Sequence, residues 1–342
     1  MSSAPRRLGK GSFGCVISPA DSCAALESLR AKYPDVPFVA KVFPDGKNVE
    51  NELAAGARAL KVDPDQQHSS VGLLACDMSD EYATQARNIC DMPHVYHKQL
   101  VSAFAGRPMS DAAQLFVTHE LGLVKMFAAI EQLIRGLQAF NAVGVCHFDL
   151  KAQNILYFAR RFRIIDWGME DNMRAVFVPM AGSFYSPPDF HIACCVYLTS
   201  LGVKSYESIM EGQAIDQQKR FIQYVVANNW DLRFPEFFDQ LFELQDVSLA
   251  TKNTAAAFSV LGASDSARTA YATFKSMQKV DVYMLGFALL EFACNVPRMD
   301  AVEEHLKMFL SRVVLPMMRL DYTRRGTLAE ALTALNDILV RM

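Results

Sequence analysis

The sequence predicts an α+β protein of two lobes, a small strand-rich lobe at residues 1–102 and a larger, mostly helical lobe at residues 103–342. The length of 342 residues suggests about two compact units, since a domain holds roughly 150 residues. The hydrophobic content of 51% is enough for sizeable cores. Strand-like runs crowd the first third of the chain, and helical spacing of apolar residues dominates the rest.

Short apolar runs between turn residues predict the strands of the first lobe. The clearest is Phe38–Phe43, which lies between Pro37 and Pro44. An insertion with a helix-like middle is expected at about residues 19–36, and the Ala- and Leu-rich stretch Asn48–Leu60 predicts a helix. Further strands are expected at Leu8–Ser18, near Val71–Cys76 and at His97–Phe104.

The second lobe begins with a long helical pattern. Apolar residues keep helical spacing from Met126 to Phe140, and Gly144 ends the run. Two short strand-like runs follow, at Ile155–Phe158 and Phe162–Ile165. The remainder reads as helix and loop.

Composition excludes several classes of protein. The net charge is −3 and no long basic run exists, so nucleic-acid binding is not expected. No run of 18 apolar residues exists, so no membrane-spanning helix is expected. The eight cysteines and seven histidines lack metal-ligand spacing. We therefore expect reduced thiols in a cytoplasmic protein.

The first candidate site is a glycine-rich motif near the N-terminus, of the form G-x-G-x-x-G-x-V. Glycines let the backbone approach phosphate oxygens closely, and the amide groups supply hydrogen-bond donors. The pattern also opens dinucleotide-binding folds, where a helix follows it, whereas strand-like residues follow here. The candidate nucleotide-binding residues are Leu8, Gly9, Lys10, Gly11, Ser12, Phe13, Gly14, Cys15 and Val16.

The second candidate is Lys41, which lies inside an apolar strand. Its ammonium group requires a partner there, such as phosphate oxygens or a carboxylate. The alternative is an edge-strand lysine whose charge remains in water. Glu50 and Glu52 of the next predicted helix are candidate partners, and Glu52 is preferred because Leu53 and an alanine run follow it.

The strongest motif runs from His147 to Asn154 and continues at Asp166. Phosphoryl transfer needs a carboxylate to orient the attacking hydroxyl, oxygen ligands for magnesium and cations for the spread charge. Asp149 supplies the carboxylate, and Asn154 with Asp166 supply the oxygen ligands. Lys151 and Lys41 supply the cations.

The combination of these motifs resembles the protein kinase family, over residues 8 to about 330. Downstream, Tyr185–Asp189 is similar to the family's A-P-E segment, and Asp281–Gly286 to the D-x-W-S-x-G start of a central helix. Arg325, preferred over Arg324, stands where the family places the arginine that pairs with the acidic residue of A-P-E. The resemblance implies a bilobal protein-kinase-like fold.

The resemblance also implies an activity, a serine/threonine protein kinase that transfers the γ-phosphate of ATP to protein hydroxyls with Mg²⁺. It makes Asp149 the catalytic base, and Asn154 and Asp166 the magnesium ligands. It pairs Lys41 with Glu52 at the ATP phosphates, under a loop of Gly9, Gly11 and Gly14. Lys151 is typical of the serine/threonine branch.

Several residues depart from the family pattern. Phe148 replaces the arginine of H-R-D, and Trp167 replaces the phenylalanine of D-F-G. An insertion occupies about residues 190–278, and its aromatic residues either pack on the large lobe or form a partner surface, with packing favoured. The insertion, the H-F-D form and the compressed P-P-D region at Pro187–Asp189 are similar to divergent serine/threonine kinases of large cytoplasmic DNA viruses, which implies the host cytoplasm or the virion as the location.

Two other functions compete with this interpretation. Small-molecule kinases of the aminoglycoside or choline type often read I-D-W, as Ile165–Trp167 does, but Lys151, Gly168 and the P-P-D segment argue against them. A catalytically inactive pseudokinase scaffold is the third possibility. The presence of the lysine, aspartate and asparagine side chains of the motifs argues against it.

Overall fold

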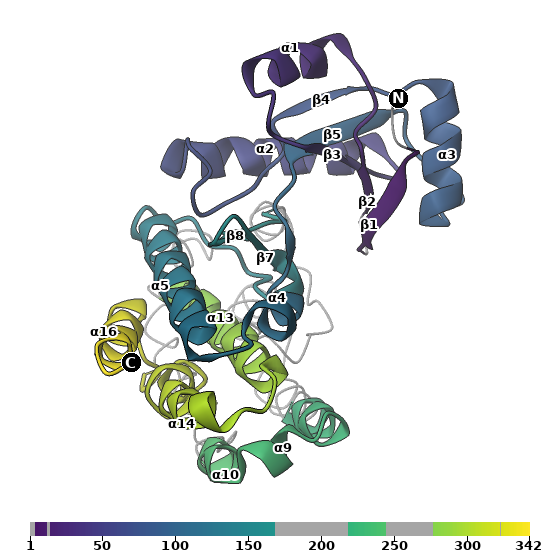
Figure 1. Ribbon diagram of the computed structural model, residues 1–342. Helices are drawn as coiled ribbons and strands as arrows, with labels where there is room; N and C mark the ends of the chain where they lie inside the picture. The colour runs from purple at the N-terminus through teal and green to yellow at the C-terminus, as the bar shows by residue number, and fades with distance from the viewer. Residues whose placement is uncertain (1–3, 12–13, 168–217, 244–275, 322) are drawn as a thin grey trace, which may run out of the picture. The chain divides into compact units, whose positions relative to one another are not determined.

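The fold is described from a computed structural model of the chain (Figure 1). It describes all residues except 1–3, 12–13, 168–217, 244–275 and 322. The structural statements below concern the described residues. Among them, no helix is long and apolar enough to cross a membrane.

The chain divides into two compact units. The first is Met1–Gly106 together with Arg163–Asp171, and the second is Arg107–Phe162 together with Asn172–Met342. The sequence placed a single boundary after residue 102. In the structure the chain leaves the first unit after Gly106 and re-enters it at Arg163. It re-enters there because Ile164 forms a parallel β-bridge with Ser69 of that unit.

The first unit is built on a five-stranded antiparallel sheet with the order β1-β2-β3-β5-β4. The strand next in sequence is usually the neighbour in space, and β4 is added at the edge beside β5. The strands are β1 (Arg6–Lys10), β2 (Cys15–Ser18), β3 (Phe38–Val42), β4 (Leu74–Asp77) and β5 (Lys98–Ala103). The helices are α1 (Ala24–Lys32), α2 (Gly46–Val62) and α3 (Asp80–Cys90).

Side-chain alternation along β3 divides the helices between the two faces of this sheet. On one face, Ala40 packs in a cluster with Leu26 of α1, and Val42 packs in a cluster with residues of α3. On the other face, Leu100 packs with Val49 of α2. Figure 1 shows α1 and α3 away from α2 across the sheet. The helix α1 confirms the helix-like middle of the expected insertion, whereas α3 was not predicted.

Two disulfides correct the expectation that all the cysteines are reduced. Cys15 of β2 is bonded to Cys90 at the end of α3, with Cα atoms 6.0 Å apart. Cys23 is bonded to Cys76 of β4, with Cα atoms 6.6 Å apart. The expectation rested on the absence of closely spaced pairs, but here the sheet brings together cysteines separated by 75 and 53 positions. Cys146 is buried and forms no disulfide, as expected.

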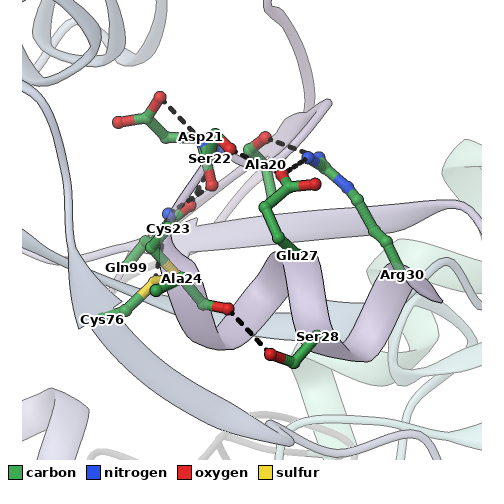
Figure 2. A network of polar contacts seen from close by, with 10 residues as sticks. All are labelled: Ala20, Asp21, Ser22, Cys23, Ala24, Glu27, Ser28, Arg30, Cys76 and Gln99. Atoms are coloured by element: carbon green, nitrogen blue, oxygen red, sulfur yellow. Dashed lines mark hydrogen bonds and ion pairs between the residues drawn. A yellow bond between two sulfur atoms is a disulfide. The ribbon is translucent and has the colours of Figure 1, made fainter. Parts of the chain in front are cut away.

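A polar network fixes the start of α1 to the sheet (Figure 2). The side chain of Gln99 is fully buried; its Oε1 accepts a hydrogen bond from the Asp21 amide at 3.0 Å, and its Nε2 donates to the Asp21 carbonyl at 2.8 Å. The Cys23–Cys76 disulfide lies beside it. Arg30 donates to the Ala20 carbonyl at 3.2 Å. The insertion is therefore anchored to β4 and β5.

The second unit is mostly helical and includes β6, β7 and the beginning of β8, which form a three-stranded sheet with the order β6-β7-β8. The catalytic-type motif His147–Asn154 directly precedes β7. The strands are β6 (Arg107–Pro108), β7 (Ile155–Phe158) and β8 (Arg161–Ile164). The helices that precede and follow it are α4 (Met109–Phe116), α5 (Glu120–Ala142), the 3-10 turn η1 (Ala152–Asn154), α13 (Ser276–Asn295), α14 (Asp300–Phe309), the π-helical η2 (Leu310–Val314), α15 (Leu315–Met317) and α16 (Leu328–Leu339).

The core of this unit lies among α5, α13, α14 and α16. Phe127 of α5 stacks on Phe309 of α14, with ring centroids 4.8 Å apart. The expected helix start at Thr327 is confirmed, because Thr327 and Glu330 form a capping box at the start of α16. Buried apolar residues line both helices of the pair α5 and α16.

The described part of the 190–278 insertion packs on this core. Residues 218–227 are helical, and α9 (Trp230–Arg233) and α10 (Pro235–Glu243) follow. The Phe221 ring lies 5.5 Å from the Phe287 ring of α13, and Phe238 is buried. Arg233 pairs with Glu303 of α14 at 2.8 Å. These contacts confirm the packing interpretation for the aromatic residues that the structure describes.

Candidate active site

Lys41 lies between two carboxylates of the first unit. On β3 it is paired with Leu100, so its side chain projects from the sheet face that α2 covers. There Nζ contacts Oε1 of Glu52 and lies 3.1 Å from Oδ1 of Asp166. Glu50 is exposed instead. The structure therefore brings together three of the predicted site residues, two from local elements and one from beyond β8.

Burial and the neighbouring carboxylates shift the pKa of Lys41 in opposite directions. Burial alone would lower the pKa of Lys41, but the Asp166 and Glu52 carboxylates outweigh burial and raise that pKa above its ordinary value. Burial raises the pKa of Glu52 to about 7, against the effect of the Lys41 ammonium. Lys41 is therefore a permanent positive charge at neutral pH, held at one place by two side chains.

Asp166 owes its position to the residues around the end of β8. Ile164 donates its amide to the His68 carbonyl at 2.9 Å and accepts from the Ser70 amide at 2.9 Å. Asp166 itself has a φ of +65°, a left-handed conformation that turns the chain sharply. Trp167 is buried and donates Nε1 to the Ile164 carbonyl at 3.2 Å. The aromatic residue after Asp166 thus acts as a packing anchor.

The glycine-rich motif forms the hairpin between β1 and β2. The amide of Gly11 donates to the Gly14 carbonyl at 2.8 Å. A Cβ on Gly14 would lie 2.8 Å from the Val42 carbonyl oxygen, so only glycine fits against β3 there. A Cβ on Gly9 would meet nothing within 4 Å, which leaves that part of the hairpin open to a ligand.

The other residues assigned to this motif differ in their access to a ligand. Leu8 is exposed, and Lys10 donates Nζ to the Asp91 carbonyl at 2.9 Å. Val16 is half-buried in β2. The Cys15 side chain is fully buried and disulfide-bonded, so a ligand can meet this residue at its backbone but not at its sulfur. Ser12 and Phe13 lie outside the described residues.

The second unit carries a compact cluster around Asp149. Lys151 donates Nζ to Oδ2 of Asp149 at 2.9 Å. Asn154 donates Nδ2 to the backbone carbonyl of Asp149 at 2.9 Å and to its Oδ2 at 3.1 Å. Asp149 and Lys151 are each about 30% exposed at the side chain, whereas Asn154 is buried. The carboxylate is thus oriented from two sides and remains open to solvent.

A buried aspartate from α13 holds the loop that bears this cluster. Asp281 is fully buried and accepts hydrogen bonds from the amides of His147 at 2.8 Å and Phe148 at 2.9 Å. His147 in turn accepts the Asp149 amide at Nδ1, at 3.2 Å. Phe148 has a φ of +63° and is buried. The sequence marked Asp281 as part of a helix motif, but its contact with the loop emerged only from the fold.

The resemblance implies magnesium ligands at Asn154 and Asp166, and each of these residues carries a side-chain oxygen of the kind that binds magnesium. Carboxylate and amide oxygens are the ligands that this hard cation prefers. The Nδ2 atom of Asn154 donates to Asp149, so the side-chain oxygen of Asn154 is not used in that contact and is the atom that would bind a metal ion. Asn154 belongs to the second unit and Asp166 to the first, and each is described within its own unit. Across the described chain, no group of three or more His, Cys, Asp or Glu forms a metal cluster by itself.

Glu291 is a further residue of this region that the sequence analysis missed. It is buried in α13, and its Oε1 accepts from Gln153 Nε2 at 3.3 Å, next to Asn154 in η1. Burial raises its pKa to about 7, while hydrogen bonds from Gln153 and Tyr224 act in the opposite direction. Tyr224 belongs to the 190–278 insertion. The helix α13, this insertion and the catalytic-type loop therefore meet at the Glu291 carboxyl group.

The downstream motifs are described in part. Gly168 and Tyr185–Asp189 lie outside the described residues. Arg325 is buried and donates to the backbone carbonyls of Lys279 at 2.9 Å and Leu320 at 3.2 Å, whereas Arg324 is exposed. Arg325 therefore joins the beginning of α13 to the segment before α16.

Comparison of this chain with protein-family models and with curated proteins gives no match. Its function is therefore argued from the two groups of residues above. One is the Lys41–Glu52–Asp166 group with the glycine hairpin, and the other is the Asp149 cluster.

Proposed function

We propose that this protein is an ATP-dependent serine/threonine protein kinase. The observation that carries the proposal is the placement of the Lys41 ammonium between Glu52 and Asp166, within the unit that also bears the glycine hairpin. A lysine inside a strand, oriented by a helix carboxylate and lying beside a potential magnesium ligand, suits the phosphates of a nucleotide. The hairpin supplies backbone amides and open glycine Cα positions for the same groups.

The Asp149 cluster suits the transfer step. The oxygen of a substrate hydroxyl attacks the γ-phosphorus, the bond from that phosphorus to the bridging oxygen breaks, and ADP leaves with the electron pair. The hydroxyl proton goes to Asp149, which Asn154 and Lys151 orient. Lys151 also offers positive charge to the transferred phosphoryl group. Magnesium held by Asn154 and Asp166 would neutralise phosphate charge.

The acceptor that we propose is a protein hydroxyl, on the basis of the family resemblance. The carboxylate is open to solvent and lies on a rigid loop, since two buried amides of that loop are bound to Asp281. Lys151, two residues after Asp149, supports serine and threonine as acceptors through the family resemblance. The I-D-W sequence at Ile165–Trp167 is also typical of small-molecule kinases, so the experiment must distinguish protein acceptors from small-molecule acceptors.

The test is an assay with γ-labelled ATP and magnesium. The purified protein is offered a mixture of basic proteins and, separately, small amino-alcohols, and label is measured on each. We expect label on protein serine or threonine, reduced at least about a hundredfold in Asp149→Asn with nucleotide binding retained. Lys41→Met is expected to lose activity as well, because it removes the phosphate-binding charge.

The matched control is Asp300→Asn, an exposed aspartate on α14, which should leave the activity unchanged. Transfer at wild-type rate by Asp149→Asn would contradict the assignment of the base. Label on the amino-alcohols alone would contradict the proposed protein kinase activity and indicate a small-molecule kinase. Nucleotide binding without any label on either acceptor would favour the scaffold.

A further inference from the structure

A cavity of about 450 Å³ lies between α5 and the turn that joins β7 to β8. Both elements belong to the second unit. Its volume is in the range of ligand-binding sites, roughly 300–1,000 Å³. Eight residues line it: the three cations Lys125, Arg160 and Arg161, the three alanines Ala128, Ala129 and Ala159, and the polar residues Glu131 and Gln132.

The cavity exists because small side chains stand where helix and turn approach each other. Lys125, Ala128 and Ala129 are spaced by three and four positions on α5, so they share one face of the helix. Ala159 stands on the turn opposite. Methyl groups on both sides leave the space unfilled and give it an apolar floor, with the cationic side chains exposed around it.

The charge of the cavity is not neutralised from within the described chain. Lys125, Arg160 and Arg161 have no ion-pair or hydrogen-bond partner for their side chains among the described residues. The acidic residue of the lining, Glu131, is instead bound by Arg135 at 2.6 Å on the same helix. Among the described residues, three cations without an ion-pair partner thus surround the alanine floor of this cavity, in a protein with a net charge of −3.

The turn between β7 and β8 contains two residues in a backbone conformation that is unfavourable for their residue types. Ala159 and Arg160 have φ values of +50° and +65°, the left-handed conformations of a tight hairpin turn. Asparagine and glycine adopt these conformations readily, whereas other residues lose about 1 kcal/mol each. Strain of this kind is often kept where a side chain has a task. Here the strained turn places the methyl group of Ala159 and the guanidinium of Arg160 in the cavity lining.

We propose that this cavity, the α5–β7/β8 cavity, binds an acidic peptide segment of a partner protein. Carboxylates would pair with the cations, and small apolar side chains would cover the alanine floor. An inorganic anion would use the charge but leave most of the volume and the apolar floor unused. None of the lining residues is aromatic, so the stacking platforms that single-stranded nucleic acids use are absent from it. Binding here needs no nucleotide and does not depend on the proposed phosphoryl transfer.

The test measures binding of a fluorescein-labelled octapeptide of alternating alanine and glutamate by fluorescence anisotropy, without ATP. We expect saturable binding that weakens as salt is raised from about 50 to 300 mM, because exposed charges are screened. The double variant Arg160→Glu/Arg161→Glu should lower the affinity at least about tenfold. The control Arg298→Glu/Arg312→Glu changes the net charge equally at exposed positions outside the cavity and should lower it less than about twofold.

A second variant separates the cavity from its charge. Ala128→Trp fills the space without changing the charge, and position 128 is exposed on α5, so the fold is expected to tolerate it. It should also lower peptide affinity at least about tenfold, with an unchanged thermal melting curve. Equal losses in the control, or no loss in Ala128→Trp, would overturn the proposal. So would competition by inorganic phosphate at the peptide's own concentration, or tighter binding of a single-stranded oligonucleotide of equal charge.

Discussion

Single side chains decide which of two neighbouring carboxylates meets Lys41. Glu50 and Glu52 are two positions apart, which on a helix places them about 200° apart around the axis. Strand alternation directs Lys41 toward α2, and α2 turns Glu52 toward the sheet while Glu50 remains exposed. The same logic of position explains the hairpin, where Gly14 lies against β3 and Gly11 does not.

The two glycines predict opposite phenotypes for the same substitution. Gly14→Ala should lower the free energy of unfolding by about 1–3 kcal/mol, because its Cβ would lie 2.8 Å from the Val42 carbonyl oxygen. Gly11→Ala should leave stability unchanged, since its nearest neighbour would be the Gly14 oxygen at 3.8 Å. If the hairpin covers phosphates, Gly11→Ala should still weaken nucleotide binding. Urea denaturation and titration with a fluorescent ATP analogue measure the two effects; equal stability losses would contradict the geometry.

Glu291 predicts a pH dependence of stability. Its pKa is raised by burial from an ordinary value near 4.5 to about 7, so between these values the folded state keeps a proton that the unfolded state has lost. Unfolding then releases a proton, and stability falls as the pH rises through this window. From pH 5 to pH 8, the wild type should lose about 2–3 kcal/mol more than Glu291→Gln.

The control for this comparison is Glu236→Gln, at an exposed position of α10. It should keep the pH dependence of the wild type. Denaturant unfolding at several pH values gives the measurement. Parallel curves for wild type and Glu291→Gln would show that the buried carboxyl does not titrate in this window.

Among the elements, α13 organises the candidate active site of the second unit. Its buried Asp281 binds two loop amides, its Glu291 binds Gln153, and its Phe287 receives the insertion through Phe221. All three contacts come from one rigid helix, so the loop that bears Asp149 is held against a single element. The short strands β7 and β8 alone would fix this loop less tightly, since two-stranded hairpins are marginal.

Asp281→Asn tests this role of α13. The substitution keeps the size of the side chain but replaces one acceptor oxygen by an NH₂ group, which faces an amide of His147 or Phe148. Leaving a buried amide unsatisfied should lower the free energy of unfolding by about 1–3 kcal/mol. Displacing Asp149 should also reduce the proposed transfer rate. Denaturation and the γ-labelled ATP assay provide the readouts, and the exposed Asp300→Asn serves as the control; a variant as stable and active as that control would refute the role.

In the molecule as a whole, stability is distributed differently over the two units. The second unit relies on a helical core of buried apolar residues. The first is a sheet whose described core residues form small separate clusters. Among the described residues, two disulfides join β2 to α3 and the start of α1 to β4. Cross-links are of greatest value where a core is small.

Reduction of the disulfides should therefore destabilise the first unit selectively. The loops of 75 and 53 positions predict about 2–4 kcal/mol for each bond. The double variant Cys15→Ser/Cys90→Ser should unfold at lower denaturant than Cys146→Ser, which removes a thiol that forms no disulfide. Mass spectrometry after alkylation of the denatured protein should find Cys15, Cys23, Cys76 and Cys90 unlabelled until a reductant is added. Labelling of all four without reductant would contradict the disulfide assignment.

The features that depend on neighbouring residues could be predicted from the sequence alone. Hydrophobic period and turn residues located β3, α2, α5 and the strands β7 and β8, and the capping box located the start of α16. The residue types of the glycine hairpin and of the Asp149 motif indicated their chemistry, and Glu52 was identified as the partner of Lys41, because helix and strand periods are local properties.

Contacts between residues that are distant in the sequence became known from the fold alone. The helix α3 was not expected because its burial depends on the β2 face that it covers. Cys15 and Cys90, Asp281 and the loop amides, and Glu291 and Gln153 are each far apart in sequence, and no local pattern joins them. The α5–β7/β8 cavity likewise arises from two elements brought together. Contacts of this kind depend on the packing of whole faces, which no window of neighbouring residues contains.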